Sequence, residues 1–313
     1  MAEQLYQRDV YGATLVKLGA LDKNIVVLDA DLSSSTRTNL FAKQFPDRFF
    51  NFGVAEQNMM ATAAGLASCG KTVFLSTFAV FAAGRAWDQV RVSISYNNFN
   101  VKIVATHAGI TVGPDGASHQ ALEDIALMRV LANMNIIVPG DAPQTEDAVM
   151  AAANNPGPFY IRLGRSKIST LENKGEFKFG QAQLLTAGND VAIVACGLMV
   201  GQALVAVKNL AAKGIQARLI NLHTIRPLDS AIILKAAKET KLIIVCEEHS
   251  IFGGLASSID EVVAENFPIK VIRVGVRNRF GQSGEPEELL KEYNLSSQDI
   301  EKAVLANISQ SKK

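Results

Sequence analysis

Glu56 is the first residue whose type and position could support chemistry. It follows a short apolar run, 49–54, and opens a segment rich in alanine and methionine with the period of a helix. The positive end of a helix dipole favours a carboxylate, and a carboxylate in a desolvated pocket can take up and return a proton. A helix-start glutamate facing solvent is the simpler alternative. The helix has almost no polar face, however, which is typical of a helix buried on all sides, as at a subunit interface.

Two aromatic residues, Phe78 and Phe81, form a second candidate group. They follow an apolar run that ends near Thr77, where their rings could stack on a planar ligand. Core packing is the commoner explanation of such a pair. Position alone leaves both explanations open.

The segment THAGITVGPDGASHQALED holds a third group. His107, Asp115 and His119 lie in it, so two of the chain's 4 histidines fall within one loop rich in glycine and proline. Loops that combine permissive backbone with titratable side chains commonly carry function. We therefore predict a binding or catalytic role for this loop.

The elements that must position these groups follow from the hydrophobic pattern. Short β-branched apolar runs alternate with longer amphipathic runs, which is the βαβ pattern of a parallel sheet covered by helices on both faces. The fold class expected is α/β. In the first half of the chain, strands are predicted at 25–31, 49–54, 72–77, 101–107, 135–140 and 159–164, and helices at 6–20, 38–45, 56–69, 82–95, 119–131 and 142–154. The candidate groups all lie at the carboxyl ends of strands, where such sheets hold ligands.

A second α/β unit follows a charged, glycine-containing stretch at 167–183 that has no sustained apolar period. Its predicted strands are 190–196, 217–223, 242–248 and 269–276, and its predicted helices are 200–213, 229–240, 254–266, 285–293 and 297–308. We expect two domains, at 1–166 and 186–313, joined by a linker at 167–185. In the second domain, we expect only packing roles for four polar residues, His223, His249, Gln282 and Ser283.

Composition restricts the class of protein. The 313 residues exceed the roughly 250–300 at which one hydrophobic core stops growing, in keeping with two domains. The net charge of +1 gives no overall field toward nucleic acid or anionic membrane, and no apolar run approaches a membrane span of about 18–20 residues. The N-terminal residues carry acidic side chains and no apolar core, and the 3 cysteines lie far apart, so we expect a cytoplasmic protein with reduced thiols.

The usual nucleotide motifs are missing. No G-x-G-x-x-G pattern follows a predicted strand, and the chain has no Walker A lysine loop. The segment 195–202 (ACGLMVGQ) is the most similar to a dinucleotide-binding turn, but its two glycines do not have the required spacing, which favours an ordinary βα turn.

Four motifs in order, FGVAEQNM, STFAVFAAGRAWDQ, THAGITVGPDGASHQ and RNRFGQSG, resemble the pyrimidine-binding and C-terminal domains of transketolase-type thiamine diphosphate enzymes. The resemblance covers essentially the whole chain. Full-length transketolases begin with a further domain whose Gly-Asp-Gly motif holds the metal and the diphosphate, and no Gly-Asp-Gly occurs here. The chain therefore resembles the C-terminal subunit of a split transketolase. This implies a separately encoded partner subunit, a heterotetramer with two chains of each kind (α2β2), and Mg²⁺ or Ca²⁺ held by the partner; no residue of this chain is assigned to metal.

The resemblance also implies roles for individual residues. Glu56 would exchange a proton with the aminopyrimidine ring of thiamine diphosphate. Phe78 and Phe81 would flank that ring, and Asp31 would lie near the cofactor. The residues that match ligands of the sugar phosphate are Asp115 and His119, for the hydroxyls of the donor, and Arg8, Ser35, His107 and Arg165, for the phosphate end. Arg162 competes with Arg165 for the phosphate.

Departures from the pattern leave other members of the superfamily open. Many transketolases carry another aromatic residue near Ala82 and Ala83, so the third contact to the cofactor ring is unassigned. The sequence AAGRAWDQ is closer to deoxyxylulose-phosphate synthase, whereas His107 stands where that synthase has arginine. The alternatives are a synthase-like half, the β subunit of a 2-oxoacid dehydrogenase decarboxylating component, and a non-catalytic protein; loss of Glu56 would have marked the last.

Overall fold

The first sheet is built from strands whose residues alternate between two apolar cores. The computed structural model describes residues 3–172 and 175–308. The strands of this sheet are β2 (Ile25–Asp29), β3 (Phe49–Asn51), β4 (Thr72–Phe78), β5 (Val101–Thr106), β6 (Asn135–Ile137), β7 (Phe159–Arg162) and β12 (Thr224–Arg226), in the order β12-β6-β7-β5-β4-β2-β3. All neighbours are parallel except β12, which pairs antiparallel with β6.

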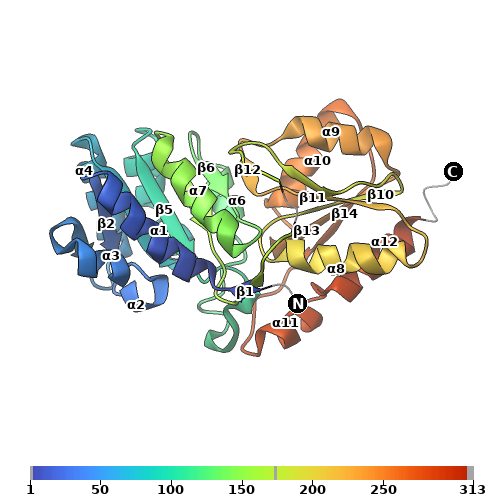
Figure 1. Ribbon diagram of the computed structural model, residues 1–313, viewed down its shortest axis with the longest axis horizontal. Helices are drawn as coiled ribbons and strands as arrows, with labels where there is room; N and C mark the ends of the chain where they lie inside the picture. Colours follow the sequence, from blue (N-terminus) through green and yellow to red (C-terminus); the bar gives the residue numbers. More distant parts are fainter. Residues whose placement is uncertain (1–2, 173–174, 309–313) are drawn as a thin grey trace.

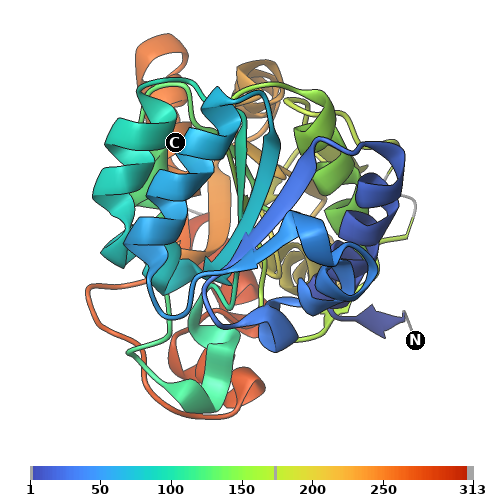
Figure 2. The ribbon, with the colours of Figure 1, turned by 90° about the vertical axis from the view of Figure 1, so that its left-hand side faces the viewer.

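Helices cover both faces of this sheet. Along β4, Val73 and Leu75 pack into one core and Phe74 into the other, as the two-residue period of a strand requires. The face with Phe74 carries α1 (Gln7–Leu21), α3 (Asn39–Gln44) and α7 (Ala142–Asn154). The opposite face carries α4 (Glu56–Ser68), the π-helical turns η2 (Phe81–Arg85) and η3 (Val90–Ser95) around α5 (Trp87–Gln89), and α6 (Asp124–Arg129). Figure 2 shows the sheet between these two groups.

The second sheet has the order β14-β13-β10-β11-β9. Its strands are β14 (Val271–Val276), β13 (Ile243–Ser250), β10 (Val191–Ala195), β11 (Ala217–Asn221) and β9 (Gln183–Thr186), and only β9 runs antiparallel. The helices α9 (Ser230–Glu239) and α10 (Leu255–Asn266) lie on one face, and α8 (Met199–Ala211) and α12 (Ser297–Ile308) lie on the other (Figure 1). The α/β fold with two mostly parallel, helix-covered sheets is therefore confirmed.

Five short elements and the loop η4 complete the description of residues 3–172 and 175–308. β1 (Gln4–Leu5) pairs antiparallel with β8 (Ile168–Ser169), which ties the beginning of the chain to the stretch after the first sheet. The turns α2 (Ser33–Thr36) and η1 (Pro46–Arg48) connect β2 to β3. α11 (Pro286–Glu292) packs against the loop η4 (Ile110–Asp115) of the first domain.

Some predicted bounds were wrong. The helix expected over 119–131 begins only at Asp124, because the preceding residues fold back beside the end of β5, where Ala108 bridges to Ala121 and Gly109 N–H donates to the Ala121 carbonyl. The helix expected over 82–95 is largely π-helical. β12 and β9 were not predicted, and β12 carries the chain of the second domain back onto the edge of the first sheet.

The two domains are joined by buried polar contacts. Glu248, at the end of β13, accepts a hydrogen bond of 2.7 Å from Thr111 N–H in the η4 loop. A Cβ added to Gly109, whose φ is +81°, would lie 2.2 Å from the Glu248 carboxyl carbon, so only glycine fits there. Burial raises the pKa of Glu248. The second domain thus holds the loop that carries His107 and Asp115, through the hydrogen bond between Glu248 and Thr111.

Candidate active site

The carboxyl ends of three neighbouring strands coincide at one edge of the first sheet. Asp29 of β2 pairs with Ser76 of β4, and Phe78 at the end of β4 pairs with Thr106 of β5. Residues just beyond these ends, such as Asp31 and His107, therefore leave the sheet at the same edge. Parallel sheets of this class hold their ligands at that place.

Glu56 begins α4, and its side chain is only 1% exposed. Arg85, the last residue of η2, donates from Nη1 to both carboxylate oxygens of Glu56, at 3.0 and 2.9 Å. The Arg85 side chain is 49% exposed, so the cation of the pair reaches solvent while the carboxylate does not. Such a carboxylate, in contact with one cation and otherwise desolvated, is suited to proton exchange with a ligand.

Aromatic rings gather next to this ion pair. The Phe78 and Phe81 rings lie 6.0 Å apart and within 13° of parallel. The His107 ring stacks on Phe78 at 3.8 Å, and His119 meets Phe81 edge-on at 5.5 Å. Arg85 Cζ lies 4.7 Å from the centre of the Phe81 ring. Flat surfaces beside a buried carboxylate fit a planar heterocycle with a basic ring nitrogen, as the aminopyrimidine of thiamine diphosphate has.

His107 is buried and neutral. Burial, followed by the positive charges of Arg8 and Arg165 and by His119, lowers the pKa of His107 to about 3. Its Nδ1 lies 2.9 Å from the Thr106 hydroxyl, and its φ is +57°. A neutral imidazole at this place can donate or accept a hydrogen bond without adding charge.

The low pKa of His107 predicts how folding stability varies with pH. The unfolded chain binds a proton at His107 near pH 6.5 and the folded chain only near pH 3, so the free energy of unfolding falls as the pH is lowered through this window. His107→Asn, which tolerates the positive φ, should remove up to about 1.4 kcal/mol of this loss per pH unit. Urea unfolding of both proteins at pH 7 and pH 5.5 measures the difference. Equal losses in the two proteins would contradict the prediction.

Arg8 and Arg165 form a cationic group near His107. Arg8 donates from Nη1 to the Ser35 carbonyl at 3.4 Å, and burial, followed by the charge of Arg37, lowers the pKa of Arg8. Arg165 donates from Nη1 to the Val112 carbonyl at 2.6 Å. Two half-buried guanidinium groups that repel each other are suited to bind an anion.

Arg162 takes no part in this cationic group. Its side chain is 6% exposed and donates to both carboxylate oxygens of Asp124, at 2.8 and 3.2 Å, and to the carbonyls of Ala121 and Glu248. Burial opposes the ionisation of Asp124, but the charge and hydrogen bonds of Arg162 outweigh it and lower the pKa of Asp124. Its guanidinium is committed to these four acceptors, which leaves Arg165 as the better candidate for phosphate.

Two further residues of the predicted site, Asp31 and Asp115, are exposed to solvent. Asp31 is exposed with a φ of +64°, and its carboxylate accepts a hydrogen bond of 3.2 Å from the Asn51 amide. Asp115 is exposed at the end of η4. Within the described part of the chain, no hydrogen bond or ion pair joins the Asp115 side chain to the ring cluster. Both positions are open to a ligand or a partner.

Arg85 is the residue that the motifs alone did not single out. Arg85 lies within the segment AAGRAWDQ, yet its partner Glu56 lies 29 residues away in the chain. Many transketolases carry another aromatic residue near the positions of Ala82 and Ala83. Here these two alanines are 0% and 1% exposed and belong to the core. The sequence signal that could have pointed to Arg85 is its place four residues after Phe81, an aromatic residue that follows a strand.

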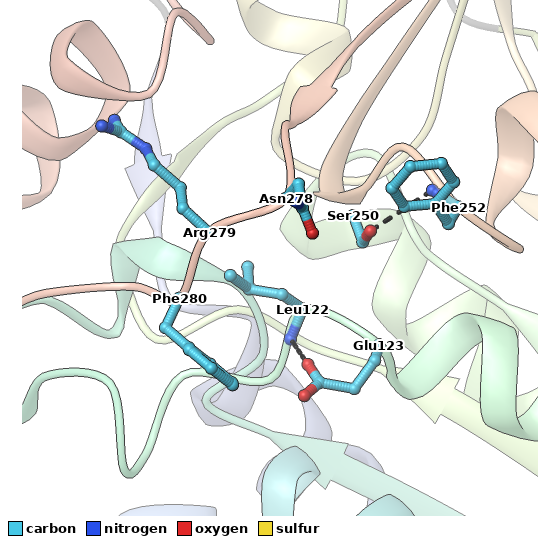
Figure 3. A pocket seen from close by; sticks show the side chains of 7 residues that line it. All are labelled: Leu122, Glu123, Ser250, Phe252, Asn278, Arg279 and Phe280. Atoms are coloured by element: carbon cyan, nitrogen blue, oxygen red, sulfur yellow. Dashed lines mark hydrogen bonds between the residues drawn. The ribbon is translucent and has the colours of Figure 1, made fainter.

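A pocket of about 230 Å³ opens at the boundary of the two domains, and none of the site residues described above lines it. Figure 3 shows Leu122 and Glu123 of the first domain facing Ser250, Phe252 and Phe280 of the second. The Glu123 carboxylate accepts from Leu122 N–H, and the Ser250 hydroxyl accepts from Phe252 N–H. The Glu123 and Ser250 side chains thus bond to local backbone, and Glu56, Phe78, Phe81 and His107 do not line this pocket.

Two further features of the described residues concern metal binding and membrane insertion. Among residues 3–172 and 175–308, no group of three or more His, Cys, Asp or Glu side chains could hold a metal ion. Over the same residues, no helix has the length and apolar character needed to cross a membrane.

Comparisons with known proteins place the chain in a family. Residues 3–170 match the model of the transketolase pyrimidine-binding domain, and residues 180–300 match that of the transketolase C-terminal domain. A protein of Methanocaldococcus jannaschii described as a putative transketolase C-terminal section is 47% identical over 302 residues, 95% of each chain. The 6-deoxy-6-sulfo-D-fructose transketolase subunit SqwH of a Clostridium species is 39% identical, covering 96% of this chain and 94% of that one. A solved structure titled as a split-gene transketolase, inactive β4 tetramer, is 49% identical with a TM-score of 0.91, covering 98% of this chain and 100% of that one.

The fold and these matches define a protein of the thiamine diphosphate-dependent transferases. The chain belongs to the transketolase family, with its pyrimidine-binding and C-terminal domains, and its chemistry is ketol transfer of the transketolase type. The family uses thiamine diphosphate and a divalent metal. These matches favour transketolase over the dehydrogenase β subunit and the synthase-like half.

Proposed function

We propose that this chain is one subunit of a two-chain transketolase that moves a two-carbon ketol unit from a ketose phosphate to an aldose phosphate. The observation that carries the proposal is the buried Glu56 carboxylate beside the Phe78 and Phe81 rings. Relatives that match over nearly their whole length are named as a section or a subunit of transketolases.

The cofactor site draws on four residues of this chain. Phe78 and Phe81 hold the aminopyrimidine, Glu56 moves a proton at its carboxylate, and Asp31 borders the cofactor at the rim. Thiamine diphosphate, when bound, supplies the carbon nucleophile and the electron sink for breaking the carbon–carbon bond of the ketose. Desolvation of Glu56, which is 1% exposed, keeps water from competing for its proton.

The substrate site draws on the cationic group and the η4 loop. Arg165, with Arg8, Ser35 and His107 close by, grips the phosphate of the sugar. Asp115 and His119 take the hydroxyls of the donor. The neutral state of His107, with its pKa of about 3, lets its ring bond to phosphate or hydroxyl oxygen as a donor.

The diphosphate and the metal belong to a separately encoded partner subunit in this proposal. The chain has no Gly-Asp-Gly, and the described residues hold no cluster suited to Mg²⁺ or Ca²⁺. We expect an α2β2 heterotetramer and no activity from this chain alone. The relative solved as an inactive β4 tetramer supports that expectation. We further propose that the protein is cytoplasmic, in keeping with its three free cysteines, and that it acts in the pentose phosphate pathway.

The experiment that tests the proposal is a pull-down of the tagged chain from its native lysate. Mass spectrometry of what co-purifies, followed by a ketol-transfer assay of the isolated complex, gives the readout. A stoichiometric partner of roughly 270–280 residues with Gly-Asp-Gly, and activity on sugar phosphates, supports it. Capture of a lipoyl-domain acyltransferase, or a complex without ketol transfer, overturns it.

Arg165 should act on the phosphate of the substrate. Replacing Arg165 by methionine should raise KM for a ketose phosphate by about 10- to 100-fold with little change in kcat, since a charge-assisted hydrogen bond contributes about 1.5–3 kcal/mol. Steady-state kinetics of the reconstituted complex measure this. The unphosphorylated ketose is the internal control, and an equal rise in its KM would show that Arg165 does not read the phosphate.

A further inference from the structure

The contact between Arg85 and Glu56 uses one nitrogen for two oxygens. Arg85 Nη1 lies 3.0 Å from one carboxylate oxygen and 2.9 Å from the other, so the pair is not a two-pronged fork. A small shift of the guanidinium would leave Nη1 on one oxygen and free the other. In this structure Arg85 Nη1 contacts both oxygens of Glu56. Neither oxygen is therefore free for the ring nitrogen that the proposed function brings to this carboxylate.

Burial makes Glu56 depend on this one cation. The carboxylate is 1% exposed, and among the described residues Arg85 supplies the only hydrogen bonds to it. A buried charge whose partner is removed is costly. Complete departure of Arg85 during cofactor binding would therefore leave the carboxylate poorly compensated, whereas a shift to one oxygen would not.

The backbone holds Arg85 near the cofactor groups. Ala86 N–H, just after Arg85, donates to the Phe81 carbonyl and closes the π-helical turn η2. The Gln57 side chain donates to the Arg85 carbonyl at 3.1 Å, which ties the turn to the start of α4. The guanidinium also lies over Phe81, at 4.7 Å. Arg85 thus joins the proton-exchanging residue to one of the two ring-binding residues.

We propose that Arg85 is a positioning residue for the aminopyrimidine: it stays on one oxygen of Glu56 and orients the other oxygen toward the ring nitrogen. This inference rests on the proposed function. Acting through Glu56, Arg85 would affect only those ligands that carry the ring nitrogen.

The test compares two probes by calorimetric titration of the reconstituted two-chain complex. One is thiamine diphosphate, and the other is its analogue with the ring nitrogen N1′ replaced by CH. Arg85→Gln should raise Kd for thiamine diphosphate by about 10- to 100-fold but change Kd for the analogue less than about threefold. Arg85→Lys, which keeps the charge, should recover part of the affinity. Lys43→Gln, the same charge change on exposed α3, should leave both affinities unchanged.

The other results are decisive as well. Equal losses for both probes would mean that Arg85 supports the structure of the site and does not act on the ring nitrogen. Unchanged or tighter binding of thiamine diphosphate by Arg85→Gln would mean that the arginine only plugs the empty site. Either result overturns the inference while leaving the proposed function intact, whereas a wild-type complex that fails to bind thiamine diphosphate overturns both.

Discussion

Glu56→Gln should lower kcat for ketol transfer by the reconstituted complex by about 10²- to 10⁴-fold, the usual contribution of a general acid–base group. Glutamine keeps the size of the side chain and its hydrogen-bonding capacity, but it cannot take up or return the proton. The loss should fall on kcat, because the aromatic contacts of Phe78 and Phe81 remain. Stopped-flow or steady-state kinetics at saturating cofactor provide the measurement.

Glu123→Gln is the matched control for this change. Glu123 also stands at the start of a helix, α6, but it is exposed and bonds to local backbone outside the ring cluster. Its replacement should leave kcat unchanged. A Glu56→Gln complex that retains more than about a tenth of wild-type kcat would exclude the proton-exchange role for Glu56.

Arg162→Met should lower the free energy of unfolding by about 3–5 kcal/mol, the usual cost of leaving one member of a buried ion pair without its partner. Asp124 is 0% exposed and, of its hydrogen-bond partners among the described residues, would keep the Tyr160 hydroxyl at 2.7 Å. The bond from Arg162 to the Glu248 carbonyl, which crosses between the domains, would be lost as well. Urea unfolding followed by far-ultraviolet circular dichroism measures the change.

Two further variants separate charge from packing at this site. The double variant Arg162→Met/Asp124→Leu removes both charges, so it should recover a large part of the lost stability. Arg165→Met should leave stability within about 0.5 kcal/mol of wild type, as is usual for a half-exposed position. If Arg162→Met proved as stable as wild type but raised KM for sugar phosphate more than Arg165→Met, the two assignments would have to be exchanged.

The sheet pattern explains why these two arginines differ. Tyr160 and Arg162 are two residues apart on β7, so their side chains share one face of the sheet, and both bond to Asp124. Arg165 lies beyond the end of the strand, at the edge where Phe78 and His107 emerge. The spacing of Arg162 and Arg165 in the sequence does not show which of them could bind phosphate. The end of β7 does, because Arg162 is the last residue of the strand and Arg165 lies beyond it.

Much of the fold could be predicted because it depends on local periodicity. The strands around 72–77 and 101–107 were expected nearly where β4 and β5 lie, since buried parallel strands are continuous apolar runs. Phe78 and His107 lie at the ends of β4 and β5, where they were expected, whereas β3 already ends at Asn51 and Glu56 begins α4. The predictions that were wrong, such as the missing β12 and the early start given to α6, concern segments whose conformation depends on contacts with residues far away in the sequence.

The sequence by itself determined the α/β class, the order of its elements and the residue types that stand at the edge of the first sheet, because these depend on side chains within a few positions of one another. Only the tertiary structure decided which cation meets which carboxylate. Arg85 lies 29 residues from Glu56, and Arg162 lies 38 from Asp124. Coulomb energy and desolvation depend on distance in space and on burial, and neither is written in the local pattern.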